Sequence, residues 1–295
     1  MTSQAADAGG ERGVGSSGER GALGSLGALD GQYATGLSRR DIERALADAG
    51  QDLGGLKPAD LGMLEDFHTL GRLATAQLME LAGVGGADYV LDAGTGIGGT
   101  ARFLADRYGC RVAGVDLTAE YVETARWLDQ LVGLDGRITP HQGDVTDLPF
   151  ADGSFDVVVS QHVQMNIADK ALLYGEARRV LADGGRLALW DVTAGEGALD
   201  DADFPLPWAD RPELSHLAAP DELRAVIGAA GFEIAHWKDL TDDAAPFMAT
   251  VLSTEPGPLG LQAFVPDFAR KVRNLTRALA NGRLRVIQGI AKVSG

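Results

Sequence analysis

The ten residues from Val90 to Gly99, Val-Leu-Asp-Ala-Gly-Thr-Gly-Ile-Gly-Gly, are the feature that most constrains how this chain can fold. A short apolar strand runs into a turn that contains four glycines, and we expect a helix over about 100–108 to follow the turn. Glycine lets the backbone turn tightly and approach a ligand where a side chain would stand in the way. The amide groups at the start of such a helix point at whatever lies over the turn. The segment therefore predicts a ligand-binding strand–turn–helix unit.

An acidic residue makes this prediction more specific. The spacing of Gly94, Gly96 and Gly99 also fits the general dinucleotide-binding pattern, which by itself is weak support. Asp92 lies at the end of the strand, directly before the glycines. Its carboxylate would repel a pyrophosphate and attract a ligand that carries an ammonium group.

Two further acids follow the next two predicted strands. A strand over about 111–115 ends at Asp116, which lies 20 residues after Gly96. At this separation a carboxylate on the second strand accepts hydrogen bonds from ribose hydroxyls. A strand over about 137–142 precedes Asp144, which could accept a hydrogen bond from an adenine amino group. Acids at three successive strand ends, in register with a glycine turn, favour a nucleoside site over three solvated turns.

At these motifs the chain resembles the class I S-adenosylmethionine-dependent methyltransferases, and within them the small-molecule, natural-product type. The likeness covers about residues 58–240, and the motifs that carry it are Val90–Gly99, Asp116, Gly143–Asp144, Leu148–Val159 and Arg179–Trp190. The resemblance implies an α/β, Rossmann-like sheet of seven mostly parallel strands with one antiparallel edge strand and helices on both faces. The last predicted strand, 284–293, alternates poorly, which suggests that it is covered on both faces.

The resemblance also implies the cofactor, S-adenosylmethionine, with S-adenosylhomocysteine as its product. Asp92 and the glycine turn would hold the methionine end, Asp116 the ribose, and Asp144 with Val145 the adenine. The full set of cofactor-binding residues that we expect is Asp92, Gly94, Thr95, Gly96, Asp116, Leu117, Asp144, Val145 and Gln161.

The rest of the chain is predicted to surround this core. Residues 1–31 contain nine glycines among serines, alanines and charges, so we expect a disordered tail. Residues 32–84 are predicted to form an N-terminal helical lid, and 85–295 the methyltransferase core. Two insertions in that core, 194–218 and 241–282, are where we expect the acceptor to be selected.

Catalysis by such an enzyme depends first on holding the acceptor in line with the methyl group, which can supply about 7–11 kcal/mol. A general base adds only about 10²–10⁴-fold. His162 follows the fourth strand, in a segment that lies beside the sulfonium in similar enzymes, and imidazole titrates near neutrality. Asp191 ends the fifth strand, where some related enzymes carry a catalytic acid, and His68 lies in the lid. We therefore predict His162, Asp191 and His68 as catalytic, with a structural role as the alternative for each, and predict that the acceptor contacts Tyr33, Met165 and Trp208.

Composition narrows the partners. The formal net charge is −16, from 26 Lys and Arg against 42 Asp and Glu, and no basic run is present. This argues against a nucleic-acid partner, whose binding depends on phosphate neutralisation. The five histidines lack close metal-ligand spacing, so no metal site is predicted. No apolar stretch is long enough for a signal sequence or a membrane span, so we expect a cytoplasmic enzyme. Its partners would be a small-molecule acceptor and a second copy of the chain in a homodimer.

The resulting hypothesis is methyl transfer from S-adenosylmethionine to a small acceptor of secondary metabolism. The acceptor atom stays open among N, O and ring C, with a lean toward an aromatic ring such as a phenol or an indole. One alternative is an NAD(P)-dependent oxidoreductase. Only the glycine spacing favours it, and the sequence lacks an obvious catalytic Tyr-x-x-x-Lys pair. The other is a non-catalytic binding protein with the same fold.

Overall fold

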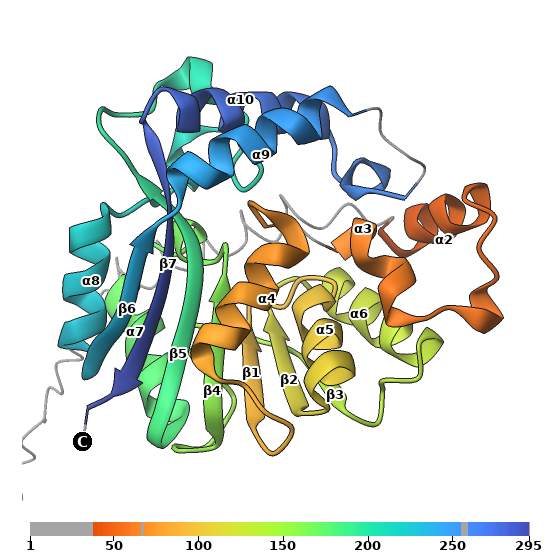
Figure 1. Ribbon diagram of the computed structural model, residues 1–295, viewed down its shortest axis with the longest axis horizontal. Coiled ribbons are helices and arrows are strands. Elements are labelled where there is room, and N and C mark those ends of the chain that lie inside the picture. The colour runs from red at the N-terminus through yellow and green to blue at the C-terminus, as the bar shows by residue number, and fades with distance from the viewer. Residues whose placement is uncertain (1–37, 66–67, 255–258, 295) are drawn as a thin grey trace, which may run out of the picture.

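The computed structural model describes residues 38–65, 68–254 and 259–294. The predicted tail, 1–31, and the predicted acceptor contact Tyr33 lie outside the described residues. Seven strands form one sheet in the order β3-β2-β1-β4-β5-β7-β6 (Figure 1). Their bounds are β1 (Tyr89–Ala93), β2 (Arg111–Asp116), β3 (Ile138–Gln142), β4 (Phe155–Gln161), β5 (Leu181–Ala194), β6 (Phe232–Asp239) and β7 (Leu284–Val293).

The sheet confirms the predicted mixed architecture. Strands β1 to β5 pair in parallel, whereas β7 is antiparallel to both β5 and β6. The reversed strand lies one position in from the edge, and β6 is the outermost strand. Most residues of β7 are buried and most of β6 are not, so the more apolar strand occupies the inner position.

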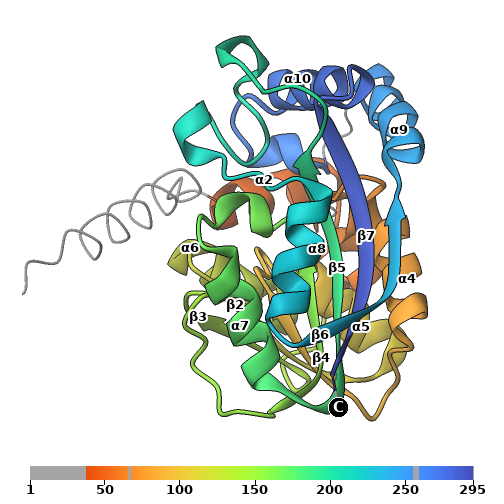
Figure 2. The same cartoon turned by 90° about the vertical axis from the view of Figure 1, so that its left-hand side faces the viewer.

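Helices cover both faces of the sheet, as predicted (Figures 1 and 2). Val90 of β1 lies in a core cluster with residues of α4 (Gly71–Ala82) and α5 (Gly99–Tyr108). The next residue, Leu91, lies in a second cluster with residues of α7 (Lys170–Val180) and α8 (Pro220–Ala229). This alternation follows from the two-residue side-chain period of a strand. A further helix, α6 (Ala119–Leu131), contacts β2 and β3.

The remaining helices lie beyond the carboxyl ends of the parallel strands, at the top and upper right of Figure 1. The α-helices among them are α2 (Ser38–Asp48), α3 (Gly62–Glu65), α9 (Thr241–Ser253) and α10 (Phe268–Ala280). Short 3₁₀ helices connect the chain at η1 (Leu53–Gly55), η2 (Pro58–Leu61), η3 (Gln164–Asn166), η4 (Asp201–Asp203), η5 (Pro212–Leu214) and η6 (Leu261–Ala263). The predicted insertion 241–282 thus contains two helices at this end of the sheet.

The predicted N-terminal lid divides into two parts in the structure. α4 buries Ala74, Leu78 and Met79 against the sheet and belongs to the core. Only the segment from α2 to α3 lies beyond the strand ends (Figure 1). The difference arises because α4 presents an apolar face wide enough to cover the sheet. Within the residues that the structure describes, no helix is long and apolar enough to cross a membrane.

Candidate active site

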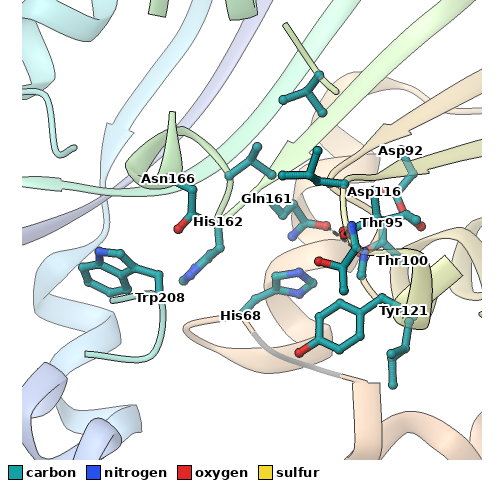
Figure 3. A pocket seen from close by; sticks show the side chains of 18 of the residues that line it. His68, Asp92, Thr95, Thr100, Asp116, Tyr121, Gln161, His162, Asn166 and Trp208 are labelled. Atoms are coloured by element: carbon teal, nitrogen blue, oxygen red, sulfur yellow. Dashed lines mark hydrogen bonds between the residues drawn. The ribbon is translucent and has the colours of Figure 1, made fainter. Parts of the chain in front are cut away.

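A cavity, partly open to solvent, lies at the carboxyl ends of β1, β2 and β4 (Figure 3). It receives side chains from the glycine turn, from the loops after the strands, and from both insertions. The predicted site residues that line it are His68, Asp92, Gly94, Thr95, Gly96, Asp116, Leu117, Asp144, Val145, Gln161, His162, Met165 and Trp208. The sequence therefore identified residues that the fold brings to one place.

Two glycines of the turn have different neighbours. Gly94 has a φ of +80°, and a Cβ there would lie 2.4 Å from a methyl group of Val163. Gly96 has a φ of +55°, and a Cβ there would meet nothing within 4 Å. Gly94 is therefore needed for packing against the β4 loop, whereas Gly96 leaves space in the cavity wall.

Asp92 is an almost fully buried carboxylate at the foot of the cavity. It is 3% exposed, and its Oδ2 accepts a hydrogen bond of 2.7 Å from the Thr95 hydroxyl. Burial raises the pKa of Asp92 to about 6; the Thr95 hydrogen bond opposes this shift and the nearby Asp116 carboxylate adds to it. A cationic ligand beside Asp92 would relieve this unfavourable environment.

Backbone amides orient the other two acids. Asp116 accepts hydrogen bonds from the N–H groups of Gly96 at 2.8 Å and Thr118 at 3.0 Å, one on each carboxylate oxygen. In Asp144, Oδ1 accepts from both the N–H and the hydroxyl of Thr146, at 2.8 and 2.7 Å. Both carboxylates are thus fixed in direction before any ligand binds.

Gln161 ends β4 and joins the strand to two helices. Its Oε1 accepts hydrogen bonds from the hydroxyl of Thr100 in α5, at 3.1 Å, and from that of Thr75 in α4, at 3.3 Å. Thr100 also lines the cavity, and sequence analysis did not single it out.

Sequence analysis also missed a buried ion network under the cavity wall. Arg102 is 1% exposed; its Nε donates to Glu65 at 2.7 Å and one terminal nitrogen donates to Asp129 at 2.7 Å. Glu65, which lines the cavity, also lies 3.5 Å from Arg72. Its charge is therefore compensated within the protein, unlike that of Asp92. An arginine on the buried face of a helix was the available signal.

His162 and His68 face each other across part of the cavity, with ring centroids 5.6 Å apart (Figure 3). Burial, and then the neighbouring His68, hold the pKa of His162 well below its usual 6.5. Burial and the charge of Arg72 lower the pKa of His68 to about 4. Both imidazoles are therefore neutral near neutral pH.

Asp191 occupies a different place from the one predicted. It is fully buried and does not line the cavity. Its neighbours on β5, Trp190 and Val192, point to the α4 side of the sheet, so Asp191 points to the other side, under the β4 loop. There it accepts a hydrogen bond from the Val163 N–H at 3.1 Å. The structure thus places Asp191 outside the described lining of the cavity, where its carboxyl supports the loop that carries His162.

The first insertion, 194–218, forms another wall of the cavity. Trp208 is 2% exposed, and its indole N–H donates to the Ser215 hydroxyl at 3.0 Å. The His216 N–H donates to the Met165 carbonyl at 2.7 Å, and the Lys170 ammonium donates to the His216 carbonyl at 2.6 Å. These bonds fix the insertion against the β4 loop. The apolar and aromatic residues on this side of the cavity are Met165, Ile167, Pro207 and Trp208, whereas Phe264 belongs to a separate core cluster with Ile97 and Trp127.

The charge of the cavity is one-sided. Asp92, Asp116, Asp144 and the arginine-paired Glu65 contribute carboxylates, and none of the described lining residues is a lysine or an arginine. Among the residues that the structure describes, no group of three or more His, Cys, Asp or Glu is placed to hold a metal ion.

Comparison with known proteins agrees with this geometry. Residues 91–189 match the family model described as "Methyltransferase domain". A sarcosine/dimethylglycine N-methyltransferase from Halorhodospira halochloris is 34% identical over 158 residues, which cover 54% of this chain and 56% of that protein. Methyltransferase GfsG from Streptomyces halstedii is 29% identical over 198 residues, or 65% of this chain and 70% of that protein. The first of these matches thus spans only about half of its relative's length.

Solved structures share the fold. A geranyl diphosphate C-methyltransferase from Streptomyces coelicolor A3(2) aligns with a TM-score of 0.68 at 17% identity, over 91% of this chain and 97% of the other. The glycine turn, the acids at the strand ends, the strand order and these matches agree with one another. In its fold the chain therefore resembles the class I S-adenosylmethionine-dependent methyltransferases, and over residues 91–189 it matches a methyltransferase domain.

Proposed function

We propose that this chain transfers the methyl group of S-adenosylmethionine to a small, mainly apolar organic acceptor. The observation that carries the proposal is the cavity with four carboxylates, of which Glu65 is paired with arginines, and with no lysine or arginine among its described lining residues. The polar groups of S-adenosylmethionine outside its own carboxylate are an ammonium, a sulfonium, ribose hydroxyls and an adenine amino group. These groups are cations or can donate hydrogen bonds, so they match a cavity of acceptors even though adenine and ribose also carry acceptor atoms. A phosphate-bearing ligand does not match it, which also disfavours the NAD(P)-dependent alternative.

Each of the three aspartates has a part in holding the cofactor. The buried Asp92 carboxylate would pair with the ammonium group, because a nearby cation favours its ionised form. Asp116 would accept from the ribose hydroxyls, and Asp144, with Val145 beside it, would hold the adenine. When bound, the cofactor supplies a methyl group on a positively charged sulfur that leaves readily. The contribution of this chain is then to orient the acceptor and to exclude water.

The acceptor side favours an apolar molecule with a flat ring. Trp208 offers aromatic surface, and Met165 and Pro207 complete an apolar wall. Sarcosine carries a carboxylate and geranyl diphosphate a diphosphate, and the described lining residues offer neither of them a basic partner. We therefore propose a phenol- or indole-like acceptor of secondary metabolism. The cytoplasmic location, the homodimer and the lack of a nucleic-acid partner remain predictions.

Titration calorimetry with S-adenosylmethionine, S-adenosylhomocysteine and NADH, in parallel, tests the cofactor. We expect binding of the first two and none of NADH, and binding of NADH alone would overturn the proposal. Incubation with S-adenosylmethionine and libraries of amines, phenols and indoles, followed by mass spectrometry for products with an added CH₂, then tests the acceptor. Methylation confined to charged amino acids or phosphorylated compounds would contradict the proposed acceptor class.

A further inference from the structure

Thr69 connects three parts of the active site that lie far apart in the sequence. It is 1% exposed and lies just before α4. The indole N–H of Trp190, in β5, donates to the Thr69 hydroxyl at 2.9 Å. The Thr69 N–H lies 3.3 Å from Nε2 of His162, and the Thr69 hydroxyl lies 3.2 Å from the same nitrogen.

The direction of these bonds follows from which groups can only donate. A backbone N–H has no lone pair, so Nε2 of His162 must accept from it and cannot itself carry a proton on that side. The indole N–H also only donates, so it uses a lone pair of the Thr69 hydroxyl and leaves the hydroxyl hydrogen for Nε2. His162 Nε2 therefore accepts from both groups of Thr69. In a neutral imidazole the single proton must then be on Nδ1.

The second ring nitrogen of His162 faces the cavity. Among the described residues, no group forms a hydrogen bond with Nδ1. If Nδ1 were also fully buried, it would be a buried polar atom without a partner, and it is not one, so part of its surface is accessible. His162 lines the cavity, and its own burial class is intermediate. The Nδ1 atom of His68, in contrast, is buried without a partner.

The backbone of His162 supports the same orientation. Its φ is +56°, a conformation that a residue with a side chain adopts at a cost. The His162 N–H donates to the Trp190 carbonyl at 2.9 Å, and the Val163 N–H donates to Asp191 at 3.1 Å. Hydrogen bonds from the peptide groups before and after the His162 Cα thus fix the backbone from which the imidazole projects.

We propose that Thr69 is a positioning residue that fixes His162 as the neutral tautomer with its proton on Nδ1. His162 then donates a hydrogen bond to the acceptor, and does not remove a proton from it. This inference rests on the proposed function and narrows the acceptor class. The molecule must present a lone pair, such as that of a carbonyl, ether or hydroxyl oxygen, to His162 while its apolar part contacts Trp208.

Nuclear magnetic resonance of the full chain, labelled with ¹⁵N-histidine, tests the tautomer without any acceptor or cofactor. Correlations between the ring carbon-bound protons and the two ring nitrogens distinguish Nδ1–H, Nε2–H and imidazolium. The His162→Gln variant identifies the His162 signals, because they disappear from its spectrum. We expect His162 to be Nδ1–H and not to titrate between pH 6 and 8, which is roughly the range in which an ordinary imidazole changes charge. A spectrum of Nε2–H, or of an imidazolium in this range, would overturn the proposal.

Two variants of Thr69 test its positioning role. Thr69→Val removes the hydroxyl at nearly constant volume and leaves only the longer bond from the backbone, so we expect a mixture of the two neutral tautomers. Thr69→Ser restores the hydroxyl and should restore the single Nδ1–H form. An unchanged tautomer in Thr69→Val would show that the hydroxyl does not position His162. Calorimetry with S-adenosylhomocysteine on the same samples keeps the two proposals apart, because cofactor affinity should be equal in all three proteins. If none of them binds S-adenosylhomocysteine, the proposed function fails while the tautomer result still stands.

Discussion

The Asp191 carboxyl accepts a hydrogen bond from the backbone N–H of Val163, with 3.1 Å between oxygen and nitrogen. Burial raises the pKa of Asp191 well above its ordinary value, and the nearby Lys170 ammonium only partly opposes this shift. Asp191 is thus a buried acid that favours its neutral form and supports the residue after His162. This relationship separates a positioning role from a catalytic one.

An Asp191→Asn variant should keep most of the methyl-transfer activity, because the amide oxygen can still accept from Val163 and the side chain remains neutral. Asp191→Ala leaves that buried N–H unpaired, at a cost of about 1–3 kcal/mol in unfolding free energy. It should also lower turnover. Urea denaturation and formation of S-adenosylhomocysteine measure both effects. An Asn variant as inactive as the Ala variant would mean that Asp191 acts as a base after all.

Asp116→Ala should weaken binding of S-adenosylhomocysteine by about 1–3 kcal/mol, because the ribose hydroxyls lose a charged acceptor. The exposed Asp147, in the turn after Asp144, provides the control, and Asp147→Ala should leave the affinity unchanged. Titration calorimetry of both variants checks the expectation. Equal affinities for the parent and Asp116→Ala would remove Asp116 from the ribose site.

The sequence predicted the parts of the site that are local. The strand, the glycine turn and the helix from Val90 onward are contiguous, and Asp116 follows at a spacing that parallel strands impose. Asp191 was expected to end its strand, but β5 continues to Ala194, and which face of the sheet Asp191 reaches depends on one residue of register. The burial of β7 was predicted from its poor alternation of apolar and polar residues. Its position between β5 and β6 could not be predicted in the same way, because it depends on whether β6 or β7 takes the inner place beside β5.

The unpredicted contacts join residues that are far apart in the chain. Glu65 and Arg102 are separated by 37 positions, and Arg102 and Asp129 by 27. No spacing rule links such residues, because their meeting depends on how whole helices pack. The same holds for Thr69, which lies 93 positions from His162 and 121 from Trp190.

Gly94→Ala should mainly lower the stability of the fold, whereas Gly96→Ala should mainly lower the affinity for the cofactor. At Gly94 the new methyl group would lie 2.4 Å from the Val163 side chain, and such overpacking lowers the unfolding free energy by about 1–3 kcal/mol. At Gly96 the methyl group meets open space in the cavity wall, so the fold loses only the backbone cost of about 1–2 kcal/mol. In Gly96→Ala, the loss of cofactor-binding free energy should exceed the loss of unfolding free energy. Urea denaturation and calorimetry compare the pair, and an identical loss of stability would contradict the assignment.

Arg102→Met should be the most destabilising of these changes. It leaves Asp129 buried without its cation and Glu65 with only the more distant Arg72, and breaking a buried pair in this way costs about 3–5 kcal/mol. Since the two acids can then take up protons, the loss should be smaller at low pH than at high pH. Arg44→Met is the control: Arg44 forms an exposed pair with Asp41, worth roughly 0–1 kcal/mol. Denaturation of both variants at two pH values tests the size and the sign of the difference.

Binding of S-adenosylhomocysteine should weaken when the pH falls below about 6, because Asp92 has a pKa of about 6 before the ligand binds. The ammonium group of the ligand favours the ionised carboxylate and lowers that pKa in the complex. Above the free pKa the carboxylate is already charged, so the affinity stays constant as the pH rises toward neutrality. Below it, binding must first expel a proton, and each further pH unit costs up to about 1.4 kcal/mol, or tenfold in affinity.

Calorimetry across this pH range, in two buffers of different ionisation enthalpy, would count the protons released. Asp92→Asn should bind more weakly at neutral pH and lose the pH dependence. Asp129 is the matched control, because burial also raises its pKa to about 6 but it lies in the Arg102 network and does not line the cavity. Asp129→Asn should therefore keep the dependence. A profile that disappears in Asp129→Asn and survives in Asp92→Asn would place the titrating group outside the cavity and remove Asp92 from the ammonium site.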